Sequence, residues 1–561
     1  MAREGFLLLL IWGIATWVDL DKPFQVDDPF HVEMAQWVEQ HPTKPLSGSI
    51  VWGNGLVPMH HGNQPPGFYY VLAASGSVFG YSERAMHLTR SLFSLLALVC
   101  FFRLARARGA RSPISVTALL ALGPAFLVNQ GVMIDVPLLA LHLLFFDLLL
   151  IPRNDSPSRR YVLAGMVLFA GLFFKYNTAP LLFLFPLALI LNNEKRLLWT
   201  TLIPPVLLGL WCCWNLWEFG SPHLIGREAL SLEQRPLWQR IVAWMTTAGA
   251  IAPFALSLFL ATLPRIRKHS TWILCAALLV FVLFAIGVHQ GIVEERTADT
   301  LLFAAFVGNG GLLIAATMRS SRRPRMDIFT WMLVGWCVSM MSFILVFAPF
   351  MATRHVLLVI PAMLLLAIPV FDRLNGSTRG LTIASTACLG LLLTLSDRLY
   401  ADYYRHQATH YAVTLRDEGR LWSTGLWGWY WYTKQAGIFI YPDDPSAAEG
   451  LRTGDVLLTA HNVHGQEIAP GLRLEPLMDS YEFPSIGTFF CTGHHASMFT
   501  SDLGHLPWHL SRSRRNHISA HRVTVIRNDS APGLGPTPTH VQADLDDRTT
   551  EGVVPRSIIH R

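Results

Sequence analysis

Long runs of apolar residues follow one another from the N-terminus to about residue 397, each ended by charge or by Pro and Gly. A bilayer core about 30 Å thick takes about 20 mostly apolar residues per helical crossing. The pattern therefore predicts a polytopic α-helical membrane protein with about thirteen transmembrane helices. The predicted crossings lie near residues 5–20, 85–102, 114–130, 133–151, 161–174, 177–192, 198–217, 239–263, 270–288, 299–318, 328–350, 355–371 and 380–397.

Composition agrees with this pattern. Of 561 residues, 52% are hydrophobic and only 15% are charged, whereas a soluble domain has about 25% charged residues. This excludes a cytosolic multidomain enzyme. The formal net charge of +6 does not indicate nucleic acid, because the basic residues stand in short clusters between apolar runs. We expect a lipid bilayer and no nucleic acid among the partners.

The basic clusters also predict the orientation. Positively charged residues are enriched in cytoplasmic connections, and every cluster falls on one side if the N-terminus is cytoplasmic. Residues 161–192 then form two short helices broken at Lys175-Tyr176-Asn177, with Lys175 at the outer turn. The chain after residue 397 lies outside the cytoplasm, which suggests a bacterial inner membrane and a periplasmic C-terminal part. The clusters lie at 103–111, 153–160, 195–196, 265–268, 319–325 and 373–379.

The chain divides into three predicted regions. Residues 1–397 form the transmembrane domain, with a large first outer loop at 21–84 whose two apolar stretches are too short to cross and would lie at the interface. Residues 398–526 alternate aromatic-rich segments with turns, which predicts a small mixed α/β domain. Residues 527–561 are predicted to be disordered. The first apolar run also fits a secretory signal peptide, but it lacks a small-residue cleavage site, which favours an uncleaved helix.

The outer loop contains two adjacent acids that are candidates for catalysis. Asp27 and Asp28 follow the first helix, and adjacent carboxylates repel, so one of them has a raised pKa suited to proton abstraction, or the pair binds a cation. The alternative is a solvated acidic turn that caps the next helix. Asp135 stands at the outer end of an apolar span, where an ionisable residue marks a site unless it only snorkels or caps.

Cations gather on the same predicted side. Arg90, Lys175, Arg354 and His355 all stand at outer ends of spans, where they would hold the phosphate of a lipid or simply anchor at the interface.

Two imidazoles, His60 and His61, precede Gln64 and a Pro-Pro turn, and they would bind phosphate or zinc. The doublet lacks the i, i+4 spacing of helical metal ligands. The sequence therefore does not decide whether the protein binds a divalent metal. Six of the seven cysteines lie in apolar runs and Cys491 stands alone, so no disulfide framework is predicted.

Taken in order, these features resemble a known family. They are an outer acidic pair, a Pro-Pro-x-x-Tyr-Tyr segment, an Arg in the next helix, an Asp-x-Pro-Leu helix start, a Lys at a short-helix turn and an Arg-His-x-Leu-Leu-x-x-Pro stretch. Together they resemble the bacterial relatives of the protein O-mannosyltransferases and lipid A aminoarabinose transferases. These are GT-C fold glycosyltransferases of family 39, which use polyprenyl-phosphate sugars. The resemblance covers roughly residues 1–400.

The resemblance implies roles for several residues. Asp27 matches the catalytic acid, with Asp28 where the family usually has Glu. Asp135 matches a second acid and Arg90 the basic residue of the second helix. Gln64 departs from the pattern, because many relatives have Lys near the lipid phosphate at this position. The contact of that Lys with the lipid phosphate would here be made by His60, His61 or Lys175.

The implied activity is inverting transfer of a sugar from a polyprenyl-phosphate donor to an acceptor on the outer side of the membrane. Asp27 would be the base or orient the acceptor, Asp135 would position the acceptor or a cation, and Arg90, Lys175 and Arg354 would stabilise the leaving phosphate. The acceptor is a protein, a lipid or a glycan. The competing hypotheses are a transporter or flippase, which would favour inverted repeats that the sequence does not show, and a non-catalytic membrane scaffold.

Overall fold

The fold is described from a computed structural model. It covers residues 2–526 apart from 53–54, 63, 153–155, 227–234, 322–326, 443–449, 470, 483–484, 494, 497, 501–503 and 514–515. The tail that the sequence predicts to be disordered, residues 527–561, lies outside the described residues.

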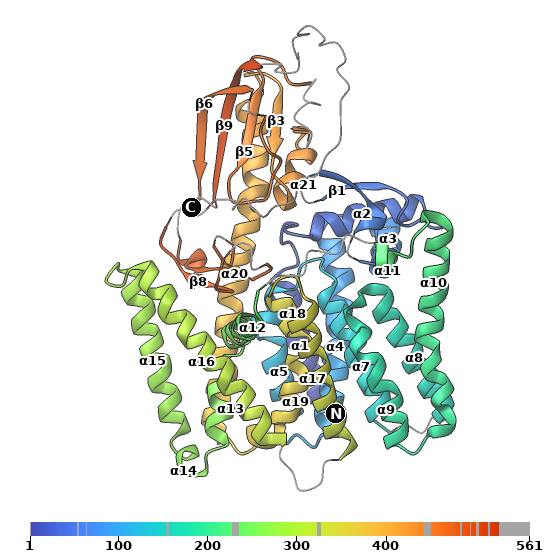
Figure 1. Cartoon of the computed structure of the whole chain (residues 1–561). Helices are drawn as coiled ribbons and strands as arrows, with labels where there is room; N and C mark the ends of the chain where they lie inside the picture. Colours follow the sequence, from blue (N-terminus) through green and yellow to red (C-terminus); the bar gives the residue numbers. More distant parts are fainter. Residues whose placement is uncertain are drawn as a thin grey trace, which may run out of the picture.

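A bundle of helices forms the larger part of the molecule (Figure 1). Among the described residues, six helices are long and apolar enough to cross a membrane, and a bent pair adds a seventh. The prediction of a polytopic helical membrane protein is confirmed at this level. The six are α4 (Glu83–Ala107), η3 with α10 (Lys195–Leu202, Ile203–Phe219), α15 (Ser270–His289), α16 (Glu295–Ser321), α17 (Ile328–Phe347) and α20 (Gly376–Thr414). The bent pair is α12 (Leu237–Ile251) with α13 (Ala255–Ala261), at 92°.

The other predicted crossings correspond to shorter or broken helices, so the predicted number of thirteen is not reached by spans of full length. Proline explains several breaks, because it fixes φ and lacks the N–H that continues a helix: Pro124 begins α6 and Pro361 stands in the first turn of α19. The shorter helices are α1 (Ala2–Trp17), α5 (Pro113–Ala121), α6 (Pro124–Val128), α7 (Asp135–Leu150), α8 (Pro157–Phe174), η2 (Tyr176–Phe183), α9 (Leu184–Leu191), α11 (His223–Gly226), α14 (Pro264–Arg267), α18 (Thr353–Leu357) and α19 (Ile360–Phe371).

The first loop covers one end of the bundle (Figure 1). Its two apolar stretches are helices, α2 (Asp28–Gln40) and α3 (Gly67–Phe79), each of 13 residues. A hairpin of β1 (Ser49–Trp52) and β2 (Gly55–Pro58) and the short η1 (Met59–His61) join them. The loop is therefore a folded cover over the ends of the bundle helices.

The helix α20 links the bundle to a sheet domain. It runs for 39 residues, so it continues through residue 397, where the sequence predicted a domain boundary. The sheet has the order β4-β3-β5-β9-β6, with β3 parallel to β4 and β5, and β9 antiparallel to β5 and β6. Its elements are β3 (Leu421–Thr424), α21 (Trp427–Gln435), β4 (Phe439–Ile440), β5 (Val456–Ala460), β6 (Leu472–Tyr481) and β9 (His517–Ile526). A smaller ladder pairs β7 (Phe490–Cys491) with β8 (His509–Leu510), after η5 (Ile486–Thr488).

Two glycines let α12 and α16 pack with their backbones in contact. A Cβ at Gly249 would lie 1.8 Å from the Phe306 carbonyl oxygen, and one at Gly310 would lie 2.2 Å from the Met245 carbonyl oxygen. Small residues are the usual means by which membrane helices approach this closely. The crossing therefore depends on the absence of a side chain at both positions.

We expect Gly310→Ala to lower the thermal unfolding midpoint of the purified protein, because the added methyl group forces α12 away from α16. Gly308→Ala in the same helix is the matched control, since a Cβ there meets nothing within 4 Å. The control should be neutral or gain up to about 1 kcal/mol, as alanine favours helix over glycine. Equal midpoints for the two variants would contradict the packing argument.

Candidate functional site

A first buried ion pair joins the acidic loop to α18. Asp27 stands at the N-cap of α2 but makes no side-chain capping bond. Its Oδ2 instead accepts a bond of 2.6 Å from Nη1 of Arg354, and the two side chains are 11% and 10% exposed. The acid is therefore not the solvated cap that the sequence left as an alternative.

The second pair joins α7 to the break between α8 and η2. Lys175 lies between α8 and η2, as the charge pattern predicted, and its Nζ donates to Oδ1 of Asp135 over 2.8 Å. Asp135 is 1% exposed and Lys175 is 13% exposed. Asp135 stands in the first turn of α7. Asp135 is therefore buried and paired, which excludes the alternative that its carboxylate snorkels to the interface.

His31 lies close to both pairs. Its imidazole interacts electrostatically with Asp27, Lys175, Asp135 and Arg354. Both ring nitrogens are buried without a hydrogen-bond partner among the described residues. Burial lowers the pKa of His31 to about 4, so the ring is neutral at pH 7. We call these five residues the central site.

Further polar atoms near His31 are also unpaired. The Tyr69 ring lies 5.6 Å from the His31 ring, and its hydroxyl interacts with Asp27. That hydroxyl and Oδ2 of Asp135 are buried without a partner among the described residues. Most buried polar groups in proteins are hydrogen-bonded. A concentration of unpaired donors and acceptors beside two ion pairs therefore indicates a place for a polar ligand.

Asp28 belongs to a different set of contacts. Its Oδ2 accepts the Gln25 backbone N–H at 3.1 Å, and its Oδ1 lies 2.9 Å from where a Cβ on Gly131 would stand. Asp397 in α20 pairs with Lys22 and accepts 2.6 Å from Nε2 of Gln25. Burial raises the pKa of Asp28 to about 7, against the lowering effect of Lys22. We call Lys22, Gln25, Asp28 and Asp397 the supporting cluster.

The structure does not bring Arg90 to the charges around His31. Arg90 is fully buried and donates to the Gln130 side chain and carbonyl, and over 2.8 Å to Ser94 Oγ. Its charged neighbours are Asp19 and Asp28. Arg90 thus lies beside the supporting cluster, while His355 interacts with Lys175 and Asp135 at the central site.

The His60-His61 doublet makes aromatic contacts. The His60 ring stacks on Phe219 at 4.6 Å and lies 4.2 Å from the His61 ring. Gln64 Oε1 is buried without a partner among the described residues. Within the described part of the chain, no group of three or more His, Cys, Asp and Glu side chains is arranged to hold a metal ion.

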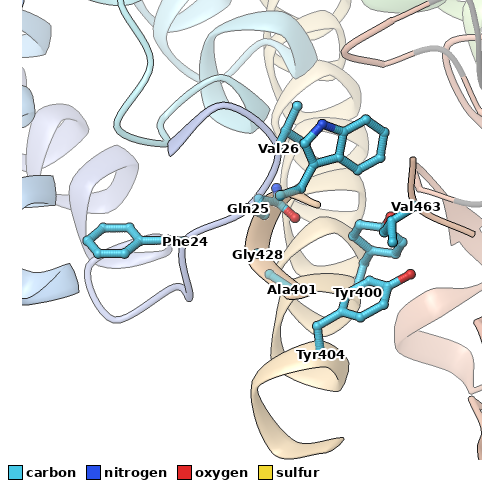
Figure 2. A pocket seen from close by; sticks show the side chains of 9 residues that line it. Phe24, Gln25, Val26, Tyr400, Ala401, Tyr404, Gly428 and Val463 are labelled. Carbon is cyan, nitrogen blue, oxygen red and sulfur yellow. The ribbon is translucent and has the colours of Figure 1, made fainter. Parts of the chain in front are cut away.

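The residue directly before the acidic pair has a strained backbone. Val26 has a φ of 49°, which a β-branched residue rarely adopts and which costs about 1–3 kcal/mol. Val26 lines a groove together with Gln25 and with Tyr400 and Tyr404 of α20 (Figure 2). Strain of this kind persists where the surroundings force it.

Sequence reasoning passed over His31, Tyr69 and Asp397. His31 follows Asp27 by four residues and its N–H donates to the Asp27 carbonyl at 3.1 Å, so helical spacing could have placed it above the acid. Asp397 is an ionisable residue at the end of a predicted span, the same signal that identified Asp135. Tyr69 carried no such signal, because buried tyrosines are common in cores.

Comparison with protein families agrees with the resemblance drawn from the motifs. The sequence model of the dolichyl-phosphate-mannose-protein mannosyltransferases matches residues 63–217, which confirms that resemblance for this part of the chain. The match includes Arg90, Asp135 and Lys175, whereas Asp27 and Arg354 lie outside it. Comparison with curated proteins finds no match.

Three solved structures illustrate the structural neighbours. ArnT from Cupriavidus metallidurans bound to undecaprenyl phosphate is 12% identical over 92% of this chain and 97% of that chain, with a TM-score of 0.49. The Archaeoglobus fulgidus oligosaccharyltransferase in complex with Zn and sulfate is 12% identical over 81% and 67%, with a TM-score of 0.46. The arabinofuranosyltransferase AftD from Mycobacteria is 14% identical over 92% and 40%, with a TM-score of 0.40.

We expect the stability of the protein to depend on pH through Asp28. Its folded pKa of about 7 lies above the ordinary value of 3.8, so protonated Asp28 stabilises the fold below about pH 4 and this contribution is lost as the pH rises through about 7. Asp28→Asn removes the titration. The unfolding midpoint of the wild type should therefore fall relative to Asp28→Asn between about pH 4 and about pH 7, and a constant difference would contradict the raised pKa.

Proposed function

We propose that this protein is an integral-membrane glycosyltransferase. It moves a sugar from a polyprenyl-phosphate donor to an acceptor on the outer side of the membrane, with inversion at the anomeric carbon. The matched family is named for a donor of this class, dolichyl phosphate mannose. Helices of spanning length would place the protein in the bilayer, where such a lipid is found.

The proposal rests on one observation: two buried ion pairs, Asp27 with Arg354 and Asp135 with Lys175, both interact with His31. Transfer from a lipid phosphate requires a carboxylate beside the attacking hydroxyl and a cation beside the leaving phosphate. Asp27 with Arg354 and Asp135 with Lys175 supply both types of charge around unpaired polar atoms. A solely structural pair would not need unpaired neighbours at its centre.

The proposed reaction is a single displacement. The acceptor hydroxyl attacks the anomeric carbon from the face opposite the phosphate, and the bond between that carbon and the phosphate oxygen breaks as the new glycosidic bond forms. Asp27 takes the hydroxyl proton or orients the hydroxyl, and Arg354 holds the carboxylate in place. Lys175 stabilises the charge that develops on the leaving polyprenyl phosphate. Asp135 orients Lys175 and the acceptor.

The proposed orientation places the central site outside the cytoplasm. α2 and the sheet domain lie at the same end of the bundle (Figure 1). The basic clusters predict that this end faces away from the cytoplasm, with a cytoplasmic N-terminus. Nucleotide sugars are absent there, so a sugar already activated on a lipid suits the location. We propose a bacterial inner membrane with the sheet domain in the periplasm.

The central test is turnover of a polyprenyl-phosphate sugar by the purified protein in lipid, read as release of free polyprenyl phosphate. Asp27→Asn should lower turnover by about 10²–10⁴, the range for a general base. Asp21→Asn is the control, since Asp21 lies in the same loop in an exposed pair with Arg84. Unchanged turnover in Asp27→Asn would overturn the catalytic assignment. Transport of the lipid across the membrane without release of polyprenyl phosphate would support a flippase instead.

We expect Lys175→Gln to raise the KM for the donor about tenfold or more, because a charge-assisted contact to phosphate is lost. Lys44→Gln is the matched control: Lys44 lies in the outer loop in an exposed pair with Glu218. Because Lys175→Gln also leaves Asp135 without its cation, Lys175→Arg tests whether a restored charge restores the donor KM. A donor KM that does not change in Lys175→Gln would remove Lys175 from the donor site.

A further inference from the structure

The segment that leads into the acidic pair lies against α21. Gly428 in the first turn of this helix stands on the backbone of the segment, since a Cβ at position 428 would lie 2.4 Å from the Phe24 carbonyl oxygen. No side chain fits at that separation, so glycine is required there. Figure 2 shows Gly428 beside Gln25 in the wall of the groove, with the Phe24 ring pointing away from it.

Tyr432, one turn further along α21, fixes the same segment by a hydrogen bond. Its hydroxyl accepts the Phe24 backbone N–H at 2.8 Å in a buried setting and donates to Glu83 Oε1 at 2.8 Å. Trp431 packs edge-on against the Phe24 ring, with ring centroids 5.5 Å apart. Both the backbone and the side chain of Phe24 are therefore held by α21.

The next residue, Gln25, is held by the two acids of the supporting cluster. Gln25 donates from its side chain to Asp397, and its backbone carbonyl accepts the Asp28 N–H at 2.9 Å. Residues 24 and 25 are thus fixed by two elements distant in the sequence. Val26 follows with its φ of 49°, a conformation that persists only where neighbouring contacts determine it. The residue after Val26 is Asp27.

We propose that α21 is a positioning element for the acidic loop. Gly428 and Tyr432 hold residues 24–26 in the strained conformation, and that conformation aims the Asp27 carboxylate at Arg354 and at the acceptor. Neither residue touches a substrate, because both act through the loop. The inference rests on the proposed function for the role of Asp27, and it makes the sheet domain a working part of the central site.

A second contact of α21 supplies a control. Tyr430 and Lys434 bind Glu33 in α2 over 3.2 Å and 2.7 Å. This contact also docks α21 on the first loop, but it leaves the backbone of residues 24–26 untouched. Tyr430→Phe therefore removes one hydroxyl from the same helix at a similar depth without releasing the loop, and Lys434 still holds Glu33.

The test compares Tyr432→Phe with Tyr430→Phe in the full-length protein in lipid. Hydrogen exchange of the Phe24 amide should be faster in Tyr432→Phe alone. The turnover number, normalised to the sites that bind polyprenyl phosphate, should fall about ten- to hundredfold in that variant, as expected for a misplaced catalytic group. The donor KM should stay unchanged, because the Lys175 pair is intact. Normalisation to binding sites removes any loss that comes only from unfolded protein.

Equal Phe24 exchange in the two variants, or faster exchange with unchanged normalised turnover, would overturn the positioning role. If the wild type itself releases no polyprenyl phosphate, the proposed function fails, and exchange alone then decides whether α21 holds the loop. Gly428→Ala gives a second measurement: it should reproduce the loss in Tyr432→Phe, and wild-type turnover in it would count against the proposal.

Discussion

The structure depends on pairing charges that would otherwise be buried alone. An unpaired ion inside a protein costs several kcal/mol, and removing one partner of a buried pair typically costs about 3–5 kcal/mol. Here Asp27 pairs with Arg354 across 327 positions of sequence, and Lys22 pairs with Asp397 across 375. The start of the chain can therefore bury its acids only when segments several hundred residues later have folded beside it. The acidic loop and the last helices of the bundle form one unit for this reason.

Pairing also makes the two adjacent acids chemically unequal. Asp27 has a guanidinium beside it, whereas Asp28 has a backbone N–H and the more distant charge of Lys22. The environment of Asp28 favours a carboxylic acid, because burial without a close cation disfavours charge. Repulsion between neighbours predicted that one acid of the pair would have a raised pKa. Which of the two acids it is depends on the tertiary contacts, about which the dipeptide itself carries no information.

The difference between local patterns and tertiary contacts explains which features the sequence could predict. The apolar pattern predicted the helical membrane fold, and the charge pattern predicted the break at Lys175, since both are local properties of the chain. Shorter helices lie at several predicted crossings, and some of them begin at a proline, so spans of full length among the described residues do not confirm the predicted number of thirteen. Arg90 was assigned by its position at a span end, but its contact with Gln130 is tertiary. Tyr432 and Gly428 stand some 400 positions from the loop that they contact, and only the fold relates them.

α20 contacts both the acidic loop and the sheet domain. Asp397 anchors Lys22 and Gln25 to the middle of this helix. Further along the same helix, Tyr404 and Tyr411 donate to Asn516 beside β9 and to the Ile518 carbonyl within it, each over 3.0 Å. α21 belongs to that sheet domain and also contacts the loop. The loop is therefore held by the sheet domain, α20 and the bundle together. Strain at Val26 is stable under that condition, and the precision of the Asp27 carboxylate is then a property of the whole fold.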